Sequence, residues 1–249
     1  MKKRAYVLIG CIILGLILFL LISYTNRKEG KSNSQIDYYY KIAKEKVKLK
    51  EFEAAEKNYR QIIALKGENA FVCNELGMLM KQQSKYDIAL EYLDRAIKFD
   101  TLDFVVYNNR GSVNEILGKT EDAEIDYSKA IEINPEYSPA YNSRGYLHFT
   151  KHEFEMAIED YSKAIKFDST YFIAYSGRAN AYYALHKYSF ALSDINRSIK
   201  YNNKFGKAYV NRGIIKYQLQ DYNGACEDWK SSVQLGERDG EKYLNAYCK

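Results

Sequence analysis

The chain has 249 residues, of which 37 are Lys or Arg and 32 are Asp or Glu. Six of the basic residues but only one acidic residue lie before residue 36, so the rest of the chain carries equal numbers of the two signs. A nucleic-acid-binding domain is expected to carry a basic surplus on its folded part, so this balance argues against a nucleic-acid partner.

The N-terminus is typical of a membrane anchor. Residues 1–4 form a basic segment, and the nineteen residues of 5–23 contain no charged side chain. A helix of that length spans roughly 28 Å, close to the ~30 Å hydrocarbon core of a bilayer. The run is longer than the core of a cleavable signal peptide, and no small-x-small cleavage site follows it. We therefore expect a transmembrane signal anchor that holds the chain to a lipid bilayer.

Two questions about this anchor stay open. Residues 8–11 resemble the lipobox of bacterial lipoproteins, which makes lipidation at Cys11 an alternative, although lipoproteins usually turn polar after that cysteine and this chain does not. Three basic residues stand on each side of the span, so the positive-inside count is nearly balanced. The tighter N-terminal cluster favours a cytoplasmic N-terminus, with everything after the span outside the cytoplasm.

Residues 24–35 are polar and predict a short linker, and a 34-residue period begins after them. Six units share one frame: 36–69, 70–103, 104–137, 138–171, 172–205 and 206–239. The eighth place is always small, as Ala43, Gly77, Gly111, Gly145, Ala179 and Gly213. The twentieth place is always alanine, as Ala55, Ala89, Ala123, Ala157, Ala191 and Ala225. Small residues at these places let two helices approach closely, so each unit is predicted to be a helix-turn-helix.

The pattern resembles the tetratricopeptide repeat, which has a small residue at place eight, Ala at twenty, an aromatic residue at twenty-four and Pro near thirty-two, here Pro135. The resemblance implies an all-α, right-handed superhelical solenoid of six units behind an N-terminal transmembrane helix, in a membrane-anchored protein of bacterial type. Residues 240–249 are expected to form a capping helix. Tyr or Cys replaces the usual Trp at place four, and Arg replaces the usual Leu at place seven in four units.

These arginines occur only in units that also carry Asp at place twenty-three. A guanidinium that faces a packed interface needs acceptors, and a carboxylate on the facing helix offers a planar, two-pronged match. We therefore expect an ion pair within each of the last four units: Arg110–Asp126, Arg144–Asp160, Arg178–Asp194 and Arg212–Asp228. The alternative is a ladder of arginines that binds anions.

No arrangement of residues predicts catalysis, a cofactor or a small-molecule substrate. His148 and His152 have a spacing that zinc can use, but the glutamate of HExxH and a third ligand are lacking, so no metal site is expected. Cys73 and Cys226 fall at places that predict small buried residues. A Cys226–Cys248 disulfide is conceivable in an oxidising compartment, and the sequence does not decide between these possibilities.

The resemblance also implies that the first helix of each unit lines a concave surface. The residues expected to face it are Asn74, Asn108, Asn109, Asn142, Tyr146, Phe149, Asn180, Tyr183, Asn211 and Tyr217. Asparagine amides can hold an extended peptide backbone in two-pronged fashion, and aromatic rings supply contact area. This set is similar to the asparagine ladder of peptide-binding relatives, whereas their basic carboxylate clamp is not matched. The alternative is that Asn and Tyr are merely abundant in this chain.

Two functions follow from these observations. The first is a non-enzymatic, membrane-anchored scaffold that binds a peptide segment or protein partner in its concave groove. The second is a structural or accessory subunit of an envelope assembly, for secretion or pilus biogenesis, that uses its convex face or the ends of the repeats.

Overall fold

The computed structural model of the protein describes residues 33–248, and within that range the chain is helical, without β-strands. The predicted all-α class is confirmed for this part of the chain. The predicted basic segment, the span at 5–23 and most of the linker lie outside the described residues. Residues 33–35 already belong to the first described helix, although they were predicted to be the C-terminal end of the linker. From residue 33 on, no helix is both long enough and apolar enough to cross a bilayer.

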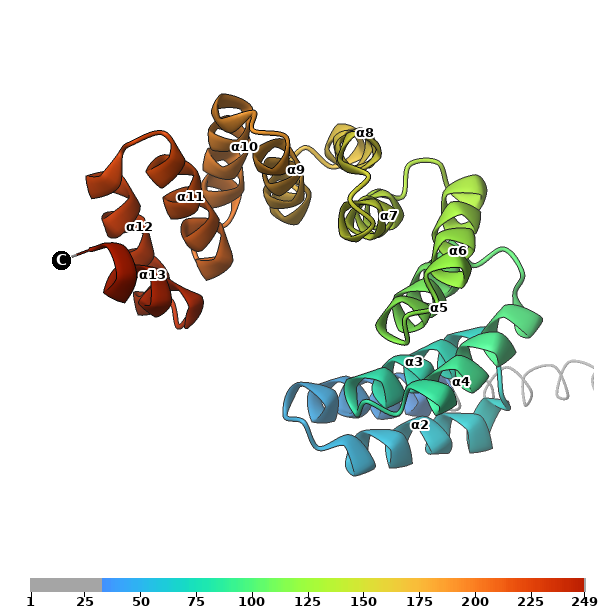
Figure 1. Ribbon diagram of the computed structural model, residues 1–249. Coiled ribbons are helices and arrows are strands. Elements are labelled where there is room, and N and C mark those ends of the chain that lie inside the picture. Colours follow the sequence, from blue (N-terminus) through green and yellow to red (C-terminus); the bar gives the residue numbers. More distant parts are fainter. Residues whose placement is uncertain (1–32, 249) are drawn as a thin grey trace, which may run out of the picture. The chain divides into compact units, whose positions relative to one another are not determined.

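The chain divides into two compact units, one ending at Asp100 and the other beginning at Thr101. The first unit holds two helix pairs (Figure 1). They consist of helix 33–48, α2 (Phe52–Lys66), α3 (Ala70–Gln82) and α4 (Tyr86–Phe99). Gly77 lets α4 approach α3, because a Cβ atom at this place would lie 2.8 Å from Cγ of Leu93.

The second unit holds four helix pairs and a final helix. The pairs are α5 (Phe104–Ile116) with α6 (Thr120–Ile133), α7 (Ser138–Thr150) with α8 (Phe154–Phe167), α9 (Phe172–Ala184) with α10 (Tyr188–Tyr201), and α11 (Gly206–Gln218) with α12 (Tyr222–Gln234). The final helix is α13 (Asp239–Tyr247). Each helix packs on the next one along the chain, so these four repeats stack in order.

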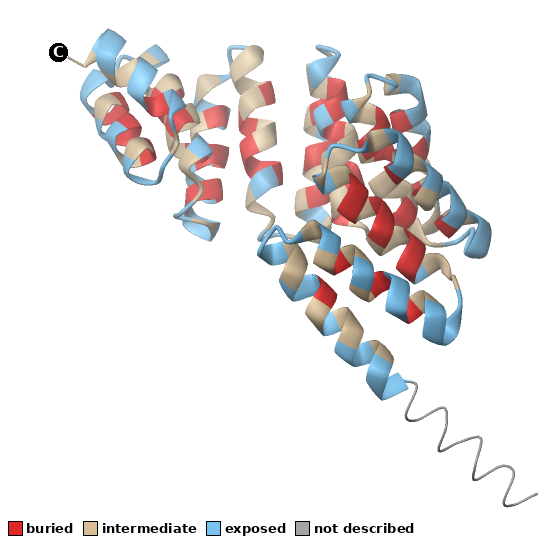
Figure 2. Cartoon of the chain, turned by 90° about the horizontal axis from the view of Figure 1, so that it is seen from below, coloured by how far each residue is buried: buried red, intermediate tan, exposed pale blue. Residues whose placement is uncertain are grey.

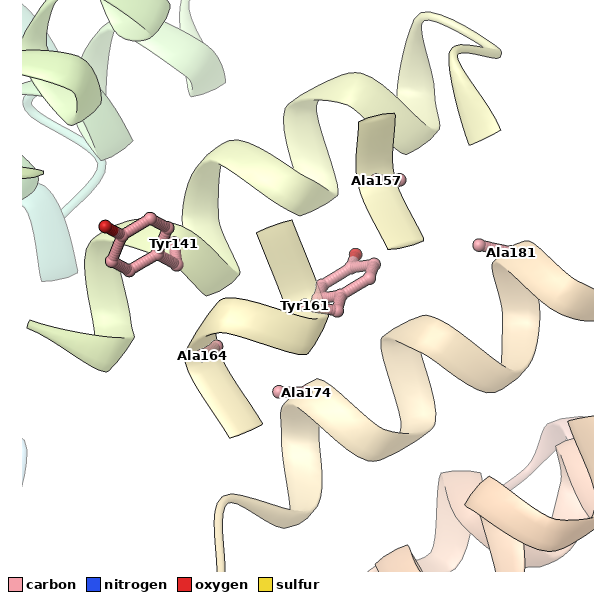
Figure 3. Close-up of a cluster of buried hydrophobic side chains, with 6 residues drawn as sticks. All are labelled: Tyr141, Ala157, Tyr161, Ala164, Ala174 and Ala181. Carbon is pink, nitrogen blue, oxygen red and sulfur yellow. The ribbon is translucent and has the colours of Figure 1, made fainter. Parts of the chain in front are cut away.

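Buried residues lie on the helix faces that turn toward neighbouring helices (Figure 2). In the fourth repeat, Ala157 is fully buried at place twenty and lets α8 lie against α7. Tyr161, one turn further along α8, fills the space toward α9 (Figure 3). Ala174 and Ala181 of α9 complete this cluster. The repeating small residues thus admit the large rings, which is the packing expected from the period.

The turn within each repeat uses a left-handed backbone conformation. Gly118 has φ +74°, and His152 and His186 take the same place in later repeats with φ of 62° and 58°. Both histidines are exposed and lie edge-on against aromatic rings two residues further along the chain. His152 and His186 therefore stand 34 residues apart because they occupy the same turn position in successive repeats.

The last repeat is closed by α13, which packs on α12. Tyr243 stacks on the indole of Trp229, with ring centroids 5.1 Å apart. Cys226 of α12 and Cys248, just beyond α13, form a disulfide. The predicted capping segment is therefore helical, and the possibility of a disulfide that the sequence left open is realised in the structure.

Candidate functional site

The first helices of neighbouring repeats lie against one another in the second unit. α7 contacts both α5 and α9, and α9 also contacts α11. Such contacts place the first helices on the inner side of the stack, where the concave surface was expected.

A cavity of about 530 Å³ opens along this inner side, over α7, α9 and α11. Its lining residues are Asn142, Tyr146, Tyr161, Ile173, Ser176, Gly177, Asn180, Phe205, Lys207, Val210, Asn211, Glu237 and Asp239. Four of the ten residues predicted to face the groove meet in this cavity: Asn142, Tyr146, Asn180 and Asn211. The lining combines amides and a serine with aromatic and aliphatic side chains, which is the composition of a site that binds a peptide by its backbone and by apolar side chains.

The amide of Asn142 has an unused hydrogen-bonding atom. Its Oδ1 is buried and accepts no hydrogen bond, and the same is true of Asn108 one repeat earlier. A buried polar atom without a partner costs about 1–3 kcal/mol, so its presence needs an explanation. An asparagine amide carries two N–H donors besides its oxygen, so Asn142 has the groups needed to bind a peptide backbone.

The floor of the cavity depends on Gly177. A Cβ atom at this position would lie 2.5 Å from Cζ of Tyr161 and 2.9 Å from its hydroxyl oxygen. The absent side chain therefore leaves room for the Tyr161 ring, which is buried and lines the cavity together with Tyr146 and Ile173. Burial raises the pKa of the Tyr161 hydroxyl, which keeps it protonated as a neutral donor. Sequence reasoning missed Tyr161 because it stands at a place that packs in every repeat.

Other predicted groove residues do not line this cavity. Phe149, Tyr183 and Tyr217 each pack a ring against the aromatic residue five positions later, with centroids 5.0–5.6 Å apart. These three rings therefore have a packing role at the turn, and their expected role toward a partner stays a prediction. Asn108 and Asn109 lie on α5, and Asn74 lies on α3 in the first unit.

The structure places each of the four arginines against the aspartate of its own repeat. In the fifth repeat, Nε and Nη2 of Arg178 donate to the two carboxylate oxygens of Asp194 at 2.7 and 2.9 Å. The same two-pronged geometry recurs in the other three repeats, as Arg110–Asp126, Arg144–Asp160 and Arg212–Asp228. The arginines are thus satisfied inside the protein, which argues against a ladder that binds anions.

A second contact of these arginines was not expected from the sequence. Nη1 of Arg178 donates to Oγ of Ser162 in the preceding repeat at 2.8 Å. Arg144 reaches Ser128, and Arg212 reaches Asn196, in the same way. Each of these guanidinium groups therefore joins the two helices of its own repeat and also fastens that repeat to the one before.

Burial and pairing pull the pKa values of these groups in opposite directions. Burial raises the pKa of Asp126, and the hydrogen bonds from Arg110 and Asn114 only partly oppose it. The hydrogen bond to Asp160 holds the pKa of Arg144 above its ordinary value. Burial lowers the pKa of Arg178, but Asp194 outweighs this effect and leaves it raised. Both shifts favour the charged guanidinium, as a structural ion pair requires.

The histidines predicted to have a zinc-compatible spacing make other contacts in the structure. Nδ1 of His148 lies 2.7 Å from a carboxylate oxygen of Glu153, and its Nε2 lies 3.6 Å from Asp160. His152 instead packs on Phe154. Between residues 33 and 248, no group of three potential ligands gathers closely enough to hold a metal ion.

Family models match three stretches of the chain. Two models described as "Tetratricopeptide repeat" match residues 36–69 and 104–137, which are the bounds of two predicted units, and one described as "TPR repeat" matches residues 149–186. Together with the repeated helix pairs, these matches show that the chain belongs to the tetratricopeptide repeat (TPR) family.

Solved structures support the same fold. The Cut9–Hcn1 hetero-tetramer of the APC/C is similar over 90% of this chain and 46% of its own, with a TM-score of 0.76 and 12% identity. PilF of Pseudomonas aeruginosa is similar over 87% of this chain and 99% of its own, with a TM-score of 0.73 and 15% identity. YrrB, described as a TPR protein with an unusual peptide-binding site, is similar over 76% of this chain and 96% of its own, with a TM-score of 0.56 and 16% identity.

A curated relative, "Protein STIP1 homolog" of Dictyostelium discoideum, is 40% identical over 53 residues. This match covers 21% of the chain and only 9% of the relative. The chain thus spans about half of the first structural neighbour and a small part of this relative, so the likeness describes repeats and not a whole protein.

Proposed function

We propose that this protein is a non-enzymatic, membrane-anchored scaffold that holds an extended peptide segment of a protein partner in the cavity over α7, α9 and α11. The observation that carries the proposal is the meeting of three asparagine amides with the rings of Tyr146 and Tyr161 in one hollow. Amides recognise a peptide backbone whatever its sequence, and the apolar walls select side chains. YrrB, a protein of the same fold, is described as having a peptide-binding site.

The segment that fits this cavity is largely uncharged. The lining of the cavity carries one basic residue, Lys207, and two acidic residues, Glu237 and Asp239, so the two signs nearly balance. No cluster of basic residues among the lining residues could bind a terminal carboxylate. Hydrogen bonds and apolar contact then supply most of the affinity, and long-range attraction supplies little.

The proposed anchor is the apolar run at residues 5–23, with the repeats outside the cytoplasm. The Cys226–Cys248 disulfide supports this side, because disulfides persist in oxidising compartments and are rare in the cytosol. A topology reporter fused after Lys249 tests the orientation, and activity of the reporter in the cytoplasm would contradict it.

Binding in the cavity can be tested on an array of fifteen-residue unstructured peptides. The purified protein is expected to select uncharged, extended sequences, and the variants Asn142→Ala, Asn180→Ala and Asn211→Ala are each expected to weaken this binding about tenfold, as loss of a buried hydrogen bond of 1–1.5 kcal/mol implies. Asn223→Ala serves as the control, because Asn223 is an exposed residue of α12 outside the cavity. Equal losses in all four variants would contradict recognition in the cavity.

The alternative is a structural or accessory subunit of an envelope assembly that uses the convex face. Ile125 favours it, since this side chain is 66% exposed on α6 at a place filled by polar residues in the other repeats. Ile125→Lys would then disrupt the assembly while the three asparagine variants would leave it intact.

A further inference from the structure

The C-terminal wall of the cavity is not made by the first helices of the repeats. Glu237 and Asp239 line it, and both belong to the short segment that joins α12 to α13 and to the start of α13. Glu237 lies close to α11, because a Cβ atom on Gly206 would be 3.0 Å from Cβ of Glu237. The backbone N–H of Glu237 also donates to the carbonyl oxygen of Ser232, so this wall is held between α12, α11 and the start of α13.

α13 has nine residues, which is too short for a helix that is stable by itself in water. Contacts with α12 and a covalent bond hold it. The rings of Tyr243 and Tyr247 pack on Trp229, and Gly240 allows α13 to begin directly against Ser232.

The covalent bond joins the far end of the helix to α12. Cys226 and Cys248 are 22 residues apart in sequence, with Cα atoms 5.8 Å apart. The loop that they close contains the whole connecting segment with Glu237 and Asp239. Any opening of α13 away from Trp229 is thus restrained at the end opposite Gly240.

We propose that the Cys226–Cys248 disulfide controls the groove: while it is intact the C-terminal wall is fixed, and its reduction releases α13 and weakens binding in the cavity. This inference rests on the proposed function, because it concerns the regulation of the same cavity. The reductant is a dithiol. Its two thiol groups supply two electrons and two protons, the Sγ–Sγ bond breaks, Cys226 and Cys248 become thiols, and the dithiol becomes a disulfide.

The expected size of the effect follows from loop closure. In the chain-entropy model, opening a closed loop of about 22 residues shifts the equilibrium between docked and undocked forms by on the order of 100-fold. Reduction is therefore expected to raise the hydrogen-exchange rate of residues 235–248 by about that factor.

The full chain in detergent can be followed through Trp229, its single tryptophan. Undocking of α13 removes Tyr243 from the indole, so dithiothreitol is expected to shift the emission to longer wavelength and to speed exchange at residues 235–248. The Cys226→Ser/Cys248→Ser variant should show the reduced behaviour without dithiothreitol and no response to it. Cys73→Ala is the matched control and should respond as the wild type does, because burial raises the pKa of the Cys73 thiol to about 11 and keeps it unreactive.

The binding measurement uses the tightest peptide from the array, labelled with fluorescein. Its affinity for the cavity is expected to fall at least tenfold on reduction and in the Cys226→Ser/Cys248→Ser variant. Unchanged exchange at residues 235–248 would overturn the inference whether or not a peptide binds. Faster exchange with unchanged affinity would also overturn it, since the wall would then be irrelevant to binding. Absence of any binder to the oxidised protein would contradict the proposed function, while exchange would still decide whether the disulfide holds the wall.

Discussion

The ion pair between Arg178 and Asp194 joins α9 to α10, and replacing Asp194 with alanine is expected to be severely destabilising. The side chains are only 15% and 6% exposed, and two hydrogen bonds of 2.7 and 2.9 Å connect them. Asp194→Ala leaves a buried guanidinium whose remaining partner is the hydroxyl of Ser162. Breaking a buried pair in this way typically costs about 3–5 kcal/mol, most of it from the charge that stays behind.

A double-mutant cycle measured by urea denaturation separates this penalty from the net value of the pair. Arg178→Leu introduces the residue that TPR proteins usually carry at this place. The Arg178→Leu/Asp194→Ala variant should regain part of the stability lost in Asp194→Ala, because it leaves no buried charge. Glu159→Ala is the control, since it removes an exposed ion pair between Glu159 and Lys163 on neighbouring turns of α8 and should change the free energy of unfolding very little.

The reasoning would be refuted if Asp194→Ala destabilised the protein no more than Glu159→Ala does. The guanidinium would then reach water when its partner is removed. A double variant as unstable as the sum of the two single variants would refute it as well, because the two side chains would not be coupled.

Three further predictions concern packing, pH and salt. Gly177→Ala forces a methyl group against the Tyr161 ring and should lower the free energy of unfolding, measured by urea denaturation, by about 1–3 kcal/mol. Adding Tyr161→Leu should restore part of this stability. A double variant with no restored stability would contradict the contact. Burial raises the pKa of Tyr59, Tyr127 and Tyr161 well above the unfolded value of about 10. The stability that these hydroxyl groups contribute is therefore complete below about pH 10 and is lost as the pH rises above it. In absorbance titrations the three tyrosines should ionise only as the protein unfolds. Peptide binding in the nearly neutral cavity should change less than threefold between 50 and 500 mM salt, and a steep loss would indicate charge recognition.

The helices of each repeat were predictable because packing repeats with the period. Ala123, Ala157, Ala191 and Ala225 recur every 34 residues, and all four are fully buried. Each lies where two helices cross and only a small side chain fits, so the sequence pattern and the structural constraint are the same. The co-occurrence of Arg at place seven with Asp at place twenty-three was informative for a similar reason, since a buried charge needs its partner in the same unit.

The contacts between repeats were less predictable. Three arginines donate hydrogen bonds to a residue of the preceding repeat: Arg144 to Ser128, Arg178 to Ser162 and Arg212 to Asn196. A serine or an asparagine at that place does not by itself predict such a contact. Both residues are common on exposed helix faces, so their presence at place twenty-five carries little information until the distance between neighbouring repeats is known.

The lining of the cavity was also hard to predict from the sequence, because it combines residues from different places of the repeat. A repeat pattern assigns one role to each place, so Tyr161 was counted with the residues that pack and Gly177 was not considered. The structure brings the two together from adjacent repeats, and the missing side chain of Gly177 leaves room for the buried ring of Tyr161 at the cavity. Binding sites in a stacked repeat protein arise from such departures from the pattern, because residues that follow it are already engaged in packing. The search for a partner should therefore begin at Gly177, where this chain differs from its own repeats.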